Sequence, residues 1–100
     1  MTSVLPAAGP TPATVARIAH GFRLQWEPAQ SCCVLLYPEG MVKLNQSAGE
    51  IIQRCDGLRD VAAIVADLET AFSTTGLAPD VLAFIELARR QGWLDWTTAR

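Results

Sequence analysis

The chain has 100 residues, half of them hydrophobic, and a formal net charge of −2 with a pI near 5.2. That length predicts a single small domain, and the acidic balance gives no long-range attraction to nucleic acids or anionic membranes. No apolar run approaches the roughly 20 residues of a membrane-spanning helix, so we expect no membrane association.

The chemistry-bearing residues do not assemble into a recognisable active or metal site. Cys32, Cys33 and Cys55 are an odd number and two are adjacent, which favours free thiols and a cytoplasmic location. His20 is the single histidine and lies outside any Cys-x-x-Cys spacing. We therefore expect no metal, no cofactor, no catalytic residues and no enzyme activity.

The first half of the chain predicts three strands after a flexible tail at residues 1–16, which are rich in Pro, Ala and Thr. Phe22–Trp26 alternates apolar and polar residues, so Phe22, Leu24 and Trp26 are expected to face the core. Cys33–Tyr37 is apolar on both faces, which predicts a central strand.

A tight turn and an edge strand follow. Pro38 suits the second position of the turn, and Gly40 is expected to adopt the positive φ that closes it. Met41–Leu44 is short and carries the charged Lys43, which is typical of a sheet edge. An open edge is a place where another peptide docks by adding a strand.

Three helices are predicted after these strands. Asn45 is expected to cap the first, with Ser47 and Glu50 as an alternative start and Asp56-Gly57 as its stop. Asp60 is expected to cap the second helix, and Pro79 to lie in the first turn of the third.

The third helix has an unusually wide apolar arc. Its apolar residues spread over roughly 220° of the helical wheel, which indicates either packing on two sides or a flank left for a partner. The fold class predicted is α+β, a three-stranded antiparallel β-meander followed by three α-helices, winged-helix-like. The domain is expected at residues 17–96, with a C-terminal tail at 97–100.

Several ordered segments resemble the pyrroloquinoline quinone biosynthesis protein PqqD family. They are Tyr37-Pro38-Glu39-Gly40, Leu44-Asn45-x-x-Ala48, Ile51-Ile52, Cys55-Asp56-Gly57 and Arg89-Arg90-Gln91-Gly92-Trp93-Leu94. The resemblance implies a stand-alone recognition element that binds the ribosomal precursor peptide PqqA. It also implies presentation of that peptide to the radical S-adenosylmethionine enzyme PqqE.

In this family the peptide lies as an added strand between the third strand and the third helix. The resemblance therefore implies a backbone ladder and a helix groove, formed by Met41, Val42, Lys43, Leu44, Leu82, Ile85, Glu86 and Arg89, with Arg90 as a further candidate.

Two alternatives stay open beside this interpretation. A winged-helix DNA-binding protein is disfavoured because the third helix would begin with Pro79-Asp80, an acidic turn that repels phosphate. The same recognition module in another modified-peptide pathway is equally compatible with the residues. We expect a monomer or weak dimer, because exposed edges invite self-pairing.

Overall fold

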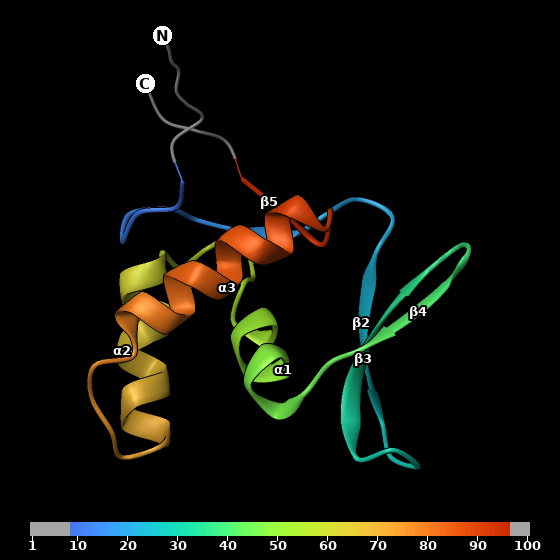
Figure 1. The fold of residues 1–100 in the computed structure, drawn as a ribbon, viewed down its shortest axis with the longest axis horizontal. Helices are drawn as coiled ribbons and strands as arrows, with labels where there is room; N and C mark the ends of the chain where they lie inside the picture. Colours follow the sequence, from blue (N-terminus) through green and yellow to red (C-terminus); the bar gives the residue numbers. More distant parts are fainter. Residues whose placement is uncertain (1–8, 97–100) are drawn as a thin grey trace, which may run out of the picture.

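A computed structural model describes residues 9–96 of the chain (Figure 1). The expected tails at residues 1–8 and 97–100 lie outside the described residues. The elements in chain order are β1 (Arg17–Ile18), β2 (Arg23–Glu27), β3 (Cys32–Tyr37), β4 (Gly40–Lys43), α1 (Gln46–Gln53), α2 (Val61–Ala71), α3 (Ala78–Arg90) and β5 (Leu94–Asp95).

The three-stranded antiparallel meander is confirmed, with the strand order β2-β3-β4. Its central strand β3 pairs Val34 with Gln25 on one side and with Lys43 on the other. Cys33, Val34 and Leu35 are all buried, as a central position requires. Both β2 and β4 are therefore edge strands of this sheet.

The β3–β4 turn differs from the expectation in one detail. Pro38 and Glu39 form the turn, and Gly40 is already paired with Tyr37 as the first residue of β4. Gly40 does not have a positive φ. The turn is made by Pro38 and Glu39, and the residue that follows them needs no left-handed backbone conformation. The expected positive φ of Gly40 is therefore wrong.

The inner face of the sheet packs on the helices, but Trp26 does not join the core. Leu24 is half-buried against the core, whereas the side chain of Trp26 is 57% exposed. Trp26 lines a cavity together with Cys33 and with Gly49 and Gln53 of α1, so the side chains of α1 do not close over its ring. The predicted burial of Trp26 is therefore wrong.

Both predicted helix caps are confirmed. The Asn45 side chain accepts a hydrogen bond from the backbone N–H of Ala48 at 2.8 Å, and Asp60 accepts one from Ala63 at 2.9 Å. The alternative start at Ser47 is not used. The helix α1 ends at Gln53, earlier than the Asp56-Gly57 stop that the sequence indicates.

Residues 9–16 are packed on the helical layer, which differs from a tail that ends at residue 16. The carbonyl of Thr14 accepts from Val61 N and that of Pro12 from Ala62 N, both at 2.9 Å, and Ala16 is fully buried. These bonds satisfy N–H groups of the first turn of α2, which otherwise lack partners. The ordered domain therefore begins before residue 17.

Residues near the two ends of the described range pair in a second, two-stranded sheet that was not predicted from the sequence. β1 pairs antiparallel with β5, with Arg17 opposite Asp95 and Ile18 opposite Leu94. Both strands are too short for a periodicity signal. The core lies between this small sheet, the helices and the inner face of the large sheet, and its largest fully buried side chains are Leu35, Ile52, Ile64, Ile85, Val61 and Val81.

Candidate peptide-binding site

The backbone of β4 presents an open edge. One hydrogen bond determines which of its N–H and C=O groups point towards β3 and which point outwards. The N–H of Leu44 donates to the carbonyl of Cys33 at 3.0 Å, so Leu44 faces β3. Because orientation alternates along an antiparallel strand, Val42 also faces β3, whereas Met41 and Lys43 direct their N–H and C=O groups away from the sheet. No hydrogen bond joins these outward groups to another residue within 9–96.

The side chains of β4 alternate between exposed and buried, so its four residues do not all contribute to docking in the same way. Met41 is 52% exposed and Lys43 is exposed, whereas Leu44 is 4% exposed and Val42 is packed against the core. Of the four residues expected in the ladder, Met41 and Lys43 have free backbone groups. Val42 and Leu44 instead attach β4 to the rest of the domain.

The predicted residues of α3 do not form one exposed flank. Ile85 is fully buried in the core, so its expected place on an exposed flank is wrong. Leu82 lines a small cavity with Pro12 and Val61, between α2 and the N-terminal segment. Packing on two sides thus explains part of the wide apolar arc: Ile85 lies in the core, and Leu82 lies beside α2 and the N-terminal segment.

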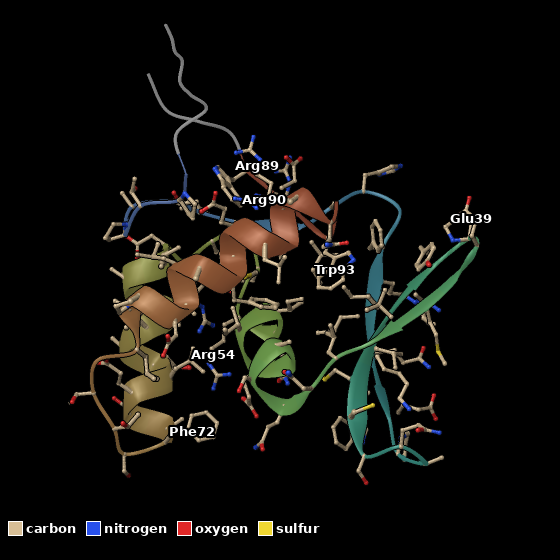
Figure 2. The ribbon with its side chains drawn as sticks, in the orientation of Figure 1. Glu39, Arg54, Phe72, Arg89, Arg90 and Trp93 are labelled. Carbon is tan, nitrogen blue, oxygen red and sulfur yellow. The ribbon has the colours of Figure 1, made fainter. Side chains whose placement is uncertain are left out.

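The charged candidates of α3 have partners of their own. The Arg89 guanidinium lies 4.5 Å from the centre of the Trp96 ring, and Arg90 forms an ion pair with Glu86 at 2.9 Å. Arg89 and Arg90 lie on the side of α3 that faces away from β4 (Figure 2). These charges are therefore not brought together with the β4 edge.

A different flank of α3 is the open one. Asp80 lines a cleft shared with α1, and Phe84 and Leu87 follow it on the same helical stripe, four and seven residues later. Phe84 is half-buried, and Leu87 is 46% exposed. Both residues are among the apolar residues of the wide arc on the third helix, but the sequence does not indicate which end of that arc the core leaves open.

The cleft beside this flank has a volume of about 400 Å³ and lies between the start of α1, the end of α2 and the start of α3. Its lining is Gln46, Ser47, Glu50, Ile51, Leu68, Phe72, Thr74, Leu77, Asp80 and Val81. Phe72 is 45% exposed at its rim, and Figure 2 shows it at the end of α2. Because Gln46 follows β4 after only two residues, the cleft begins near the end of the open edge.

Arg54 joins α1 to α2, two of the three helices that line this cleft. Its guanidinium donates to Asp67 on α2 at 2.6 Å and to the Glu50 carboxylate at 2.8 Å. Burial acts to lower the pKa of Arg54, but these hydrogen bonds outweigh it and the pKa is raised. The bond from Arg54 holds the pKa of Asp67 below its ordinary value.

The other perturbed groups are structural. The backbone N–H groups of Leu58 and Arg59 donate to the Asp56 carboxylate and lower its pKa. Burial raises the pKa of the Cys55 thiol to about 12, so this thiol is not a nucleophile at neutral pH.

Neither a metal site nor a membrane span is found in the described part of the chain. Residues 9–96 contain no cluster of three or more His, Cys, Asp or Glu side chains that is arranged to hold a metal ion. In the same range, every helix is too short or too polar to cross a bilayer.

Comparison with known proteins identifies the family. The family model described as Coenzyme PQQ synthesis protein D (PqqD) matches residues 32–94, from β3 to β5. The "PqqA binding protein" of Pseudomonas aeruginosa strain UCBPP-PA14 is 58% identical over 83 residues, which cover 82% of this chain and 90% of that protein. The chain belongs to the PqqD family.

Further comparisons agree with membership of the PqqD family. The "PqqA binding protein" of Azotobacter vinelandii is 54% identical over 82 residues, which cover 81% of this chain and 89% of that protein. The solution structure of the PqqD truncation of Methylobacterium extorquens PqqCD, described as a functional, stand-alone RiPP recognition element, matches with a TM-score of 0.74 at 22% identity. It covers 87% of this chain and 95% of that one, which confirms the predicted α+β fold.

Proposed function

We propose that this PqqD-family protein binds the precursor peptide PqqA by adding the peptide as a strand to the free edge of β4. The observation that carries the proposal is the outward backbone of Met41 and Lys43 on an exposed edge strand. Strand addition derives affinity from main-chain hydrogen bonds and specificity from pockets for alternate side chains. The names of the Pseudomonas and Azotobacter relatives support PqqA as the peptide.

The proposed contact set combines backbone and side chains. Met41 and Lys43 supply the ladder, and an added strand then directs alternate side chains towards the face that carries Val42. We propose that the Phe84–Leu87 stripe of α3 and the neighbouring cleft receive these side chains, because Leu87 and Phe72 are exposed apolar groups there. Leu82, Glu86 and Arg89 serve the domain itself in this proposal.

The role of the bound protein is that of a non-catalytic adaptor. We propose that it presents PqqA to PqqE in the cytoplasm, as a monomer or weak dimer, and that covalent chemistry belongs to the partner enzyme. The resemblance noted in the sequence supports the PqqE step. The names of the relatives as PqqA binding proteins support a binding role.

The test is a titration of isotope-labelled protein with synthetic PqqA, followed through backbone amide shifts. We expect the shifts to concentrate at Met41 and Lys43 and along Phe84–Leu87, with a scrambled PqqA of the same composition as control. A second titration adds PqqE to the complex and follows whether the shifted amides broaden further. If saturating PqqA leaves the β4 amides unmoved, strand addition at this edge is refuted. Binding of another precursor peptide in its place would assign the module to a different pathway.

A further inference from the structure

The sheet has a second open edge, on β2, whose free groups are also identifiable. Since Cys33 faces β4, its neighbour Val34 faces β2 and forms the hydrogen-bonded pair with Gln25. Leu24 and Trp26 therefore direct their N–H and C=O groups away from β3. Within residues 9–96 no other backbone or side-chain group bonds to them.

The β2 edge of one copy is complementary to the β2 edge of a second copy. β2 reads Arg23-Leu24-Gln25-Trp26-Glu27, so a basic and an acidic residue lie at equal distances from the central glutamine. When a second copy pairs antiparallel about a two-fold axis at Gln25, Leu24 of each copy faces Trp26 of the other. Arg23 of each copy then faces Glu27 of the other.

The hydrogen bonds and the charges fit in the same register. The outward groups of Leu24 and Trp26 form the hydrogen-bonded pairs, which leaves Arg23 and Glu27 in the closer, non-hydrogen-bonded positions. Opposite charges that face each other across strands stabilise a sheet. Arg23 and Glu27 belong to none of the ion pairs found among residues 9–96, so both are available.

In this arrangement the exposed side chain of Trp26 lies next to Leu24 of the second copy. The Trp26 side chain is 57% exposed on the inner face, next to a cavity of about 270 Å³ that it lines with Cys33 and residues of α1. Leu24 of the second copy lies on the same face and covers part of the ring. An exposed aromatic side chain on an unpaired edge is otherwise an aggregation hazard.

The position of α1 is compatible with the pairing. The two-fold axis is perpendicular to the sheet, so both copies of α1 lie on one face. Each α1 packs mainly on its own β3, and the two β3 strands are separated by three strand spacings, about 14 Å, which exceeds the 8–10 Å between packed helices.

We propose that β2 is a self-association edge, through which two copies join their sheets into one continuous six-stranded sheet. The pairing involves the five residues of β2 in each copy. Stable interfaces use roughly 20–30 residues a side, so the dimer is weak and forms at high protein concentration. Both β4 edges remain at the outer ends of the joined sheet, where each is free for a peptide.

Sedimentation equilibrium of the full chain and four charge variants tests this proposal. Arg23→Glu places glutamates opposite each other, and Glu27→Arg does the same with arginines. Each reversal turns two attractive pairs into repulsive ones and is expected to weaken association roughly tenfold. An equimolar mixture of the two variants restores every opposite-charge pair, so it is expected to associate about as well as the original protein. The double variant is expected to do the same.

The matched control for Arg23→Glu is Arg90→Glu, which makes the same change in net charge on α3 and is expected to leave association unchanged. Amide spectra confirm that each variant is folded. Three results overturn the proposal: a wild-type protein that stays monomeric at millimolar concentration, single reversals without effect, or a mixture that remains as weak as its components.

Discussion

Proline substitution along β4 tests the polarity of the proposed peptide-binding edge. Proline removes a backbone N–H and is tolerated only where that N–H is not part of the ladder. The alternation set by the Leu44–Cys33 hydrogen bond places the N–H of Val42 towards Leu35 and the N–H of Lys43 towards solvent. Lys43→Pro and Val42→Pro are therefore neighbours with opposite expected effects.

The magnitudes follow from the bond that each variant loses. Val42→Pro removes a net hydrogen bond worth about 1 kcal/mol and leaves the buried Leu35 carbonyl unsatisfied at a further cost of about 1–3 kcal/mol. Lys43→Pro loses no ladder bond, and its cost is expected to stay within roughly 1 kcal/mol. For the bound peptide the order reverses, because Lys43→Pro removes one intermolecular donor. We expect affinity to fall about fivefold or more.

Urea unfolding followed by circular dichroism measures the first quantity, and calorimetric titration with PqqA measures the second. Lys43→Ala is the control, since it removes the charge and keeps the N–H, and its affinity is expected to stay close to that of the original protein. If Lys43→Pro destabilises the fold as much as Val42→Pro, the assigned polarity is wrong. If Lys43→Pro and Lys43→Ala bind PqqA equally well, the peptide does not use this edge.

Three further predictions concern the helical layer. Ile85→Ala is expected to lower the free energy of unfolding by roughly 2–5 kcal/mol because Ile85 is fully buried, whereas Leu87→Ala changes it by less than about 1 kcal/mol and weakens PqqA binding. Asp67→Asn is expected to be less stable than the original protein at pH 7, with a difference that shrinks below about pH 4, near the ordinary pKa of aspartate. Cys55 is expected to resist alkylation at pH 8 in the folded protein and to react after unfolding in urea.

The sign of the Asp67 effect follows from linkage. Arg54 holds the pKa of Asp67 below its unfolded value, so the stabilisation is complete above the unfolded pKa and is lost as the pH falls through the folded pKa. Unfolding of both proteins across pH 2–7 measures it, and a gap that persists at the acidic end contradicts the reasoning. Mass spectrometry follows alkylation of Cys55; rapid labelling of the folded protein refutes its inert state. Equal losses of stability for Ile85→Ala and Leu87→Ala refute the assigned faces of α3.

Local features of the sequence determined most of the secondary structure. Asn45 and Asp60 accept the hydrogen bonds that a short polar side chain makes to the N–H groups of its own helix start, so no distant residue is needed to predict them. The strand β3 was equally predictable, because a run that is apolar on both faces suits only a central position. The resemblance to PqqD also rested on ordered local segments.

Only the tertiary structure decided which surfaces are free. Trp26 alternates with Leu24 and Phe22, yet it is exposed beside a cavity that residues of α1 line with it. On α3, Ile85 and Leu87 belong to the same apolar arc, and the packing of neighbouring elements determines which of them meets solvent. Periodicity reports the character of each residue within its own element, but exposure depends on contacts between elements. The open edges and flank that support the proposed functions are products of those contacts.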